Sequence, residues 1–172
     1  MSLRTTILTS VLGASTPVGE LRSGTISTGL DRRVITLTDG SGANQASRIY
    51  GDSGTLAASA SVTYDLYDFE GARDVEGNTF ALSKVKALAI RNNATDANSI
   101  LRVGGEGSGA TFNSVNGSDT VQIADVAPGG ELILAAPTAA GYQVADVSNH
   151  LLKLENLNNS ASLDFDLVVV GA

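Results

Sequence analysis

Turn-forming residues interrupt this sequence about every ten residues, and that spacing leaves no room for a long helix. From about residue 22 to the end, short runs of β-branched or alternating apolar residues lie between clusters of Gly, Asn, Asp and Ser. The 19 glycines match a chain with many tight turns, and the 3 prolines do not suggest a proline-rich chain. The pattern predicts strands over residues 24–29, 34–38, 56–67, 79–91, 99–103, 120–126, 131–135, 150–156 and 162–170.

Many short strands joined by such turns are typical of an all-β fold made of two antiparallel sheets, and we expect a sandwich of the jelly-roll type. The last predicted strand has two different faces. Alternate positions from 163 to 169 are apolar, whereas Asp164 and Asp166 occupy the other face. Val168 and Val170 continue that second face, so we expect its end to lie against another element or another subunit.

Two stretches of the sequence resemble each other. Residues 88–92 read Leu-Ala-Ile-Arg-Asn and residues 152–156 read Leu-Lys-Leu-Glu-Asn, and an Asn-rich loop and another predicted strand follow each. Residues 59–66 and 160–167 share a pattern in the same way. The repetition reflects either two equivalent hairpins of a two-sheet sandwich or the pattern common to all strands.

The first 21 residues fit the strand pattern least. Their apolar residues are spaced as on a helix, whereas their threonines favour a strand; the apolar residues are Leu3, Ile7, Leu8, Val11 and Leu12. We expect an N-terminal arm over residues 1–21 and a single β-sandwich domain over residues 22–172. The arm cannot bury its apolar residues alone, so we expect it to pack on its own domain or on a neighbour.

The chain carries a net charge of −7, which repels a nucleic-acid backbone unless basic residues cluster. The densest basic feature, Arg32-Arg33, lacks the interleaved aromatic residues that stack on bases. No apolar run approaches the ~18 residues that a membrane-spanning helix needs. We therefore expect neither a nucleic-acid partner nor a membrane partner. The absence of cysteine also excludes disulfides and thiolate metal sites.

Five carboxylates crowd around one predicted turn, where their oxygens could bind calcium, although their spacing does not match an EF-hand loop. They are Asp65, Asp68, Glu70, Asp74 and Glu76. We interpret them as a solvated hairpin tip with Arg73 as a partial partner. A glycosidase would need two of them across a cleft with one pKa raised, and the chain has no tryptophan to form such a pocket.

His150 is the only histidine, so a zinc site with two or three imidazoles is impossible and a Ser-His-Asp triad would depend on this residue alone. No Gly-x-Ser-x-Gly motif accompanies it, and we interpret it as a residue of a loop or strand edge. The glycine-rich residues 104–109 lack the Lys-Ser/Thr ending of a phosphate loop, so we expect a tight or mobile loop. We therefore expect no enzyme, no cofactor, and no catalytic or metal-binding residue.

Aromatic residues make up only 5% of the chain, which is few for a sugar-binding platform or an RNA-binding sheet. We expect most of them to lie in the core. Tyr64 and Tyr67 are three positions apart and so on opposite faces of a strand, which means that at most one of them can join an exposed binding surface.

Several motifs follow one another in a definite order between residues 56 and 172. They are Leu-Ala-Ala-Ser-Ala-Ser-Val-Thr-Tyr-Asp-Leu at 56–66, Gly-Asn-Thr-Phe at 77–80, Val-Lys-Ala-Leu-Ala-Ile-Arg-Asn at 85–92, Leu-Arg-Val-Gly-Gly at 101–105, Val-Ala-Pro-Gly-Gly at 126–130 and Phe-Asp-Leu-Val-Val-Val-Gly at 165–171. In this order, over about two thirds of its length, the chain resembles a family of structural proteins of the tailed-bacteriophage virion.

The resemblance implies a jelly-roll decoration, or cement, protein on the outer capsid surface. Such a protein would be a homotrimer that binds and stabilises the lattice of the major capsid protein. No catalytic residue carries over, and residues 1–21 lie outside the resemblance. We therefore expect a non-enzymatic virion protein whose arm is buried against coat subunits. The alternative is a carbohydrate- or receptor-binding tail or fibre module, because jelly rolls commonly carry such sites in their loops.

Overall fold

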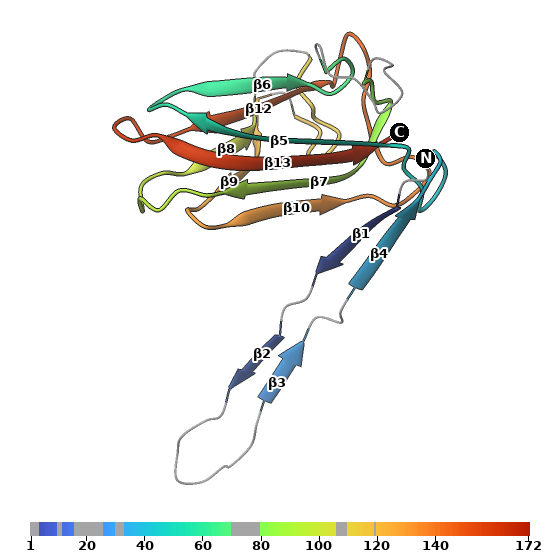
Figure 1. Ribbon diagram of the computed structural model, residues 1–172, viewed down its shortest axis with the longest axis horizontal. Coiled ribbons are helices and arrows are strands. Elements are labelled where there is room, and N and C mark those ends of the chain that lie inside the picture. The colour runs from blue at the N-terminus through green and yellow to red at the C-terminus, as the bar shows by residue number, and fades with distance from the viewer. Residues whose placement is uncertain are drawn as a thin grey trace.

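The computed structural model describes residues 4–9, 12–15, 26–29, 33–69, 80–105, 110–118 and 120–172. Within these ranges every regular element is a strand (Figure 1), and no helix that could cross a membrane occurs there. The strands are β1 (Arg4–Thr9), β2 (Leu12–Ser15), β3 (Ile26–Gly29), β4 (Arg33–Thr38), β5 (Arg48–Leu56), β6 (Ser61–Asp65), β7 (Lys84–Asn92), β8 (Leu101–Gly104), β9 (Gln122–Val126), β10 (Glu131–Ala135), β11 (Tyr142–Gln143), β12 (Leu151–Asn156) and β13 (Leu163–Gly171).

Two antiparallel sheets form the body of the protein. One has the order β10-β7-β13-β5, with β11 also paired to β7, and the other has the order β6-β12-β8-β9. The pairs β5 with β13, β6 with β12, β7 with β10 and β8 with β9 nest one inside the next along the chain. This nesting is the connectivity of a jelly roll, and the predicted sandwich is confirmed.

The alternation along β13 builds the core between the sheets. Its inward residues are almost completely buried, as predicted: Leu163, Phe165, Leu167 and Val169. β7 and β12 bring further buried side chains to the same cluster, among them Leu88, Ile90, Leu152 and Leu154. Each large apolar side chain removed from water contributes about 1.5 to 3 kcal/mol, so these three strands contribute much of the stability of the body.

The second face of β13 ends in two different environments. Val170 is 2% exposed and lies in a second apolar cluster with Leu37 of β4, so another element covers it as expected. Val168, two residues earlier on the same face, remains 38% exposed. The outer face of the five-stranded sheet is therefore only partly covered by the described part of the chain.

The single strand predicted over residues 56–67 is wrong. β5 ends at Leu56 and β6 begins at Ser61, with Ser59 at a φ of 56° in the turn between them. β5 itself was not predicted, because its Gly-Asp-Ser-Gly centre has the composition of a turn. Gly54 fits there because a Cβ atom would lie 3.1 Å from the ring of Phe165 on β13.

The segments expected to begin the sandwich belong to the arm instead. The predicted boundary between residues 21 and 22 lies outside the described residues. β3 and β4, however, pair with β2 and β1 rather than with either sheet of the body. A strand pattern predicts that a segment is extended, but it does not show which strand pairs with it. In residues 4–9 the spacing of the apolar residues suggests a helix, whereas the threonines favour the strand that forms.

The two similar stretches end at equivalent places in the two sheets. Asn92 closes β7 and Asn156 closes β12, and both side chains are fully buried. Each side-chain amide donates to backbone carbonyls of neighbouring loops, and each Oδ1 accepts the N–H two residues on. The alternative of two equivalent hairpins is wrong, because β8, which follows β7, and β13, which follows β12, each lie in the opposite sheet. What the two stretches share is the buried asparagine at the end of the strand.

Candidate functional site: the arm and the sheet face beside it

The predicted acidic cluster is only partly described. Asp65 lies at the end of β6, and its Oδ1 accepts the backbone N–H groups of Tyr67 at 2.9 Å and Asp68 at 3.0 Å. Asp65 therefore caps the turn after β6, whereas Glu70, Arg73, Asp74 and Glu76 lie outside the described residues. In the part of the chain that is described, no group of three or more His, Cys, Asp or Glu side chains could hold a metal ion.

His150 lies in the loop immediately before β12, as predicted. Its Nδ1 lies 2.8 Å from Oδ1 of Asp65, and only 13% of its side chain is exposed. Its backbone N–H donates to the carbonyl of Ala110 at 2.8 Å, and its carbonyl accepts the N–H of Leu66 at 2.8 Å. No local sequence pattern indicates the contact with Asp65, because 85 residues separate the two. The histidine ties the start of β12 to the end of β6.

The glycine-rich loop begins with a tight turn. Gly104 and Gly105 have φ values of 82° and 74°, which favour glycine, and a Cβ atom on Gly104 would lie 2.9 Å from Cγ1 of Ile123. The tight turn is confirmed for these two residues, and residues 106–109 lie outside the described ranges.

The aromatic residues are mainly internal, as predicted. Tyr50 is the centre of one group, with its ring centroid 4.3 Å from that of Phe69 and 6.3 Å from that of Tyr64. The Tyr64 hydroxyl donates to Oδ2 of Asp52 at 2.7 Å, whereas Tyr67 is 38% exposed. Burial, and then the hydrogen bond to Asp52, raise the pKa of Tyr64 above its ordinary value.

This raised pKa predicts a loss of stability in alkali. Above pH 10.0, the ordinary tyrosine value, the unfolded chain loses the Tyr64 proton while the folded chain keeps it, so the free energy of unfolding falls. Tyr64→Phe should cost about 1 kcal/mol near neutrality and make the fall shallower. Urea unfolding of both proteins at about pH 9 and about pH 11 measures this difference. Parallel losses of stability in the two proteins would contradict the prediction.

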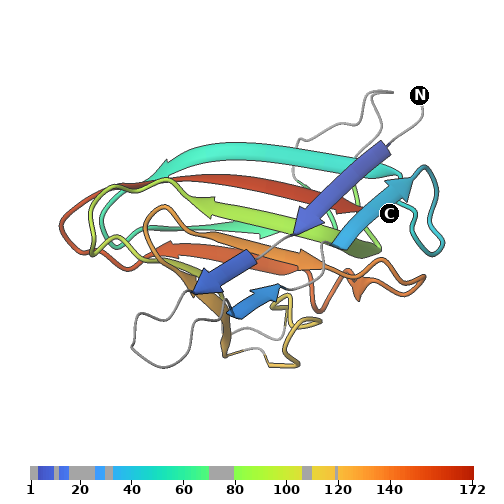
Figure 2. The same ribbon diagram turned by 90° about the horizontal axis from the view of Figure 1, so that it is seen from below.

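The arm is a two-stranded ribbon that leaves the outer face of the five-stranded sheet. β1 and β4 pair from Arg4 with Thr38 to Thr9 with Arg33, and β2 and β3 continue the ribbon. Figure 2 looks onto this sheet with the arm in front of it, and Figure 1 shows the arm extending away from the body. The arm therefore presents backbone edges well beyond the sandwich.

An apolar cluster fixes the root of the arm to the body. Ile7 and Ile35, which face each other across the ribbon, pack against a cluster of four buried residues, Leu37, Ala46, Ala87 and Val170. Ile7 is partly buried there, so at this residue the arm packs on its own domain, one of the two alternatives expected for it. The side chains of Leu3, Leu8, Val11 and Leu12 lie outside the described part of the chain.

Two lysines of β7 tie together the loops beside this root. Lys86 is fully buried, and its Nζ donates to the carbonyls of Gly42 and Ala139, each at 3.1 Å, and to that of Thr138. Lys84 Nζ donates to the carbonyls of Ser41 at 3.2 Å and Ala139 at 3.1 Å. Desolvation, and then the charge of Lys84, lower the pKa of Lys86. We call this pair the lysine clamp.

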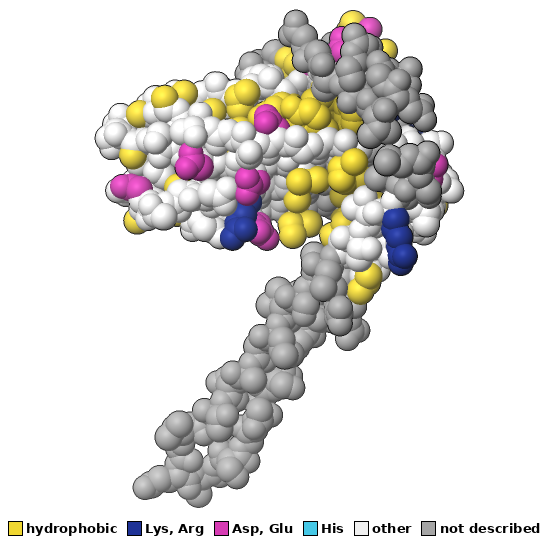
Figure 3. Space-filling view, in the orientation of Figure 1, with side chains coloured by type: hydrophobic (Ala, Val, Ile, Leu, Met, Phe, Trp, Pro, Cys, Tyr) yellow, Lys and Arg dark blue, Asp and Glu magenta, His cyan; other side chains and the backbone are white. Residues whose placement is uncertain are grey.

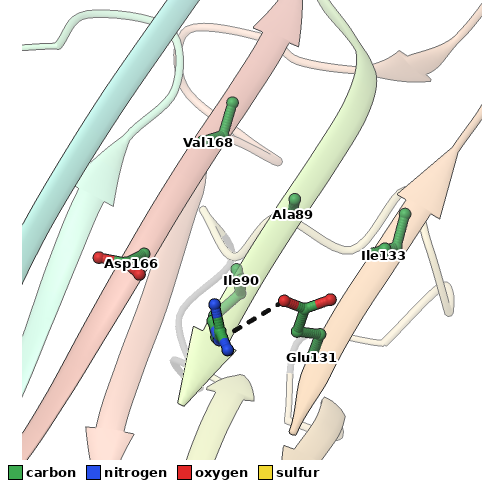
Figure 4. A pocket seen from close by; sticks show the side chains of 7 residues that line it. Ala89, Ile90, Glu131, Ile133, Asp166 and Val168 are labelled. Carbon is green, nitrogen blue, oxygen red and sulfur yellow. Dashed lines mark ion pairs between the residues drawn. The ribbon is translucent and has the colours of Figure 1, made fainter. Parts of the chain in front are cut away.

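The uncovered part of the sheet face beside the root holds a shallow depression of about 240 Å³. Its floor is apolar, formed by Ala89, Ile133 and Val168 on three adjacent strands (Figure 4). Asp166, Arg91 and Glu131 form the next row, with Arg91 Nε 3.5 Å from Glu131 Oε1. Figure 3 shows hydrophobic side chains gathered beside the root of the arm. We call this surface the apolar row.

Comparisons with known proteins assign no family. No family model matches the chain, and no curated protein matches it. A solved structure with some similarity is that of the Yersinia pseudotuberculosis-derived mitogen (YPM), 13% identical, covering 73% of this chain and 86% of that chain with a TM-score of 0.35. A score that low carries no argument, so the jelly-roll assignment depends on the strand order of the chain itself.

Proposed function

We propose that this chain is a non-enzymatic structural protein of a tailed-phage virion, a decoration protein that binds the major capsid protein lattice on the outer capsid surface. The observation that carries this proposal is the arm, a ribbon of β1 to β4 held out from a jelly-roll body (Figure 1). At about 3.3 Å per residue, the 6 residues of β1 span roughly 20 Å and the 4 residues of β2 roughly 13 Å, so the ribbon is long enough to contact a neighbouring subunit.

The way the root is built supports a role in holding subunits together. Ile7 and Ile35 are packed into the body, and the lysine clamp holds the loops on either side. A ribbon anchored in this way transmits force from a bound neighbour to the sandwich. The order of motifs from residue 56 onward points to a phage capsid as the setting.

Shortening the arm should separate attachment from folding. Thr9 and Arg33 are cross-strand partners, so replacing residues 10–32 with Asn-Gly closes the ribbon with a two-residue turn and keeps the root. We expect the shortened protein to remain folded and its occupancy on undecorated capsids to fall by at least about tenfold. Co-pelleting with capsids measures occupancy, and thermal unfolding of the free protein checks the fold.

A matched control keeps the arm and changes a remote exposed side chain. Val147 is 87% exposed, and Val147→Glu should bind capsids as the unaltered protein does. Equal occupancy for the shortened and unaltered proteins would show that the arm is not the attachment device.

A further inference from the structure

One edge of the five-stranded sheet is long and unprotected. β5 is the outermost strand beside β13 (Figure 2), and no strand in the described part of the chain pairs with its other side. It has 9 residues in unbroken register, whereas β6, β9 and β10, which also lie at sheet edges, have 5 residues each. β5 also lacks the lysines, prolines and bulges by which natural edge strands avoid pairing with another chain.

The hydrogen bonds of β13 show which groups of β5 point to that free edge. The Asn93 N–H donates to the carbonyl of Asp164 at 2.8 Å, so Asp164 turns its backbone groups towards β7. Successive residues of a strand turn these groups to opposite sides, and the register then directs alternate residues of β5 away from β13. The residues whose N–H and carbonyl groups lie at the free edge are Ile49, Gly51, Ser53 and Thr55. Because Asp52 Oδ1 accepts the Ser53 N–H at 2.8 Å, the open stretch begins at Ile49 and Gly51.

The side chains of this stretch indicate what kind of strand fits beside it. Gly51 lies opposite Val168 on the outer face, and a Cβ atom there would meet only a backbone oxygen, at 3.9 Å. Ile49 and Val168, on either side of this gap, are 50% and 38% exposed. At the inner face of the same strand the gap over Gly54 is filled by the ring of Phe165, its partner on β13. A large apolar side chain on an added strand would fill the gap over Gly51 in the same way.

We propose that the free edge of β5 pairs with an extended segment of the major capsid protein, which adds a strand to the five-stranded sheet and places a large apolar side chain over Gly51. Backbone hydrogen bonds hold the segment, and the gap selects its apolar residue. Ile49 lies opposite Val170, which the root of the arm covers, so a capsid subunit held by the arm lies next to this edge. The inference depends on the proposed function for the identity of the partner.

Gly51→Pro tests the pairing without removing a hydrogen bond to β13. Proline lacks the N–H that points to the free edge, and edge strands accept proline at such positions. We expect the variant to remain folded in thermal unfolding, and its occupancy on undecorated capsids to fall by at least about tenfold in co-pelleting. Gly51→Ala is the matched control, because it keeps the N–H, and its occupancy should stay within about threefold of the unaltered protein.

A second variant leaves the backbone of β5 unchanged. Ile49→Lys places at an exposed position the charged residue that commonly protects natural edges, and it should also lower occupancy by at least about tenfold. Hydrogen exchange gives the signature of strand pairing. The N–H groups of Ile49 and Gly51 should exchange at least about tenfold more slowly on capsids, whereas those of Tyr50 and Asp52, which bond to β13, should be slow in both states.

The outcomes separate this inference from the proposed function. Equal occupancy for the unaltered protein, Gly51→Pro and Ile49→Lys, or unchanged exchange at the free edge, would overturn the inference while the protein still binds capsids. Gly51→Pro that keeps its occupancy but loses self-association in light scattering would assign the edge to a second copy of the chain and overturn it as well. Failure of the unaltered protein to bind capsids would contradict the proposed function itself.

Discussion

Asn156→Ala should lower the free energy of unfolding by about 3 kcal/mol, a large effect for one polar side chain. Asn156 is 1% exposed at the end of β12. Its Oδ1 accepts the N–H of Asn158 at 2.9 Å. Its Nδ2 donates to the carbonyls of Leu56 at 3.3 Å, Ala57 at 3.0 Å and Ala161 at 2.9 Å. Alanine would leave these groups of two loops without their partner in a dry interior.

Asn93 provides the matched control for this change. It is exposed and donates one hydrogen bond to Asp166 Oδ2 at 2.8 Å, so Asn93→Ala should change stability by less than about 0.5 kcal/mol. Asn92→Ala should resemble Asn156→Ala, because Asn92 is the equivalent residue of β7. Urea unfolding followed by circular dichroism measures all three. Similar small losses for the buried and exposed asparagines would contradict the structural role.

Lys86→Met should lower the free energy of unfolding by about 2 to 3 kcal/mol, although methionine fits the apolar part of the site. The variant removes the ammonium group that joins the carbonyls of Gly42, Thr138 and Ala139. The loss is limited because Thr138 and Ala139 are exposed and water can reach their carbonyls. The loops after β4 and β10 would keep the hydrogen bonds of Lys84 and the one from the Asn44 N–H to the Pro137 carbonyl, but they would lose those of Lys86, so the root of the arm should loosen.

Lys84→Met is the control for the lysine clamp. Its hydrogen bonds are exposed, so we expect a loss below about 1 kcal/mol. Hydrogen exchange distinguishes the two variants further, because only Lys86→Met should speed exchange in residues 39–46 and 136–141. Unchanged exchange there, together with unchanged stability, would show that Lys86 does not hold the loops.

The elements that the sequence predicts correctly are those with a clear two-residue period next to unambiguous turns. β10 coincides with its predicted strand, and β13 shows the expected buried and exposed faces. β5 was missed because it is an edge strand with two glycines, so packing against β13 rather than residue preference makes it extended. The pairing of the arm was missed because a period of two says nothing about which strand lies alongside.

The sequence predicts less of the candidate site than of the fold. The apolar residues at the end of β13 predict that another element covers this end of the strand. At Val170 the covering element is the root of the arm. The acceptors of Lys86 are backbone carbonyls, which every residue has, so no motif points to them. The contact of Asp65 with His150 depends on β6 pairing with β12, a long-range feature that local patterns do not specify.

Electron cryomicroscopy of purified virions that contain this chain tests its assignment as a capsid decoration protein most directly. We predict density for the jelly-roll body on the outer capsid surface, in groups of three, with arms reaching to neighbouring subunits. Density for the body only at the tail or its fibres, with a bare capsid surface, would contradict the assignment.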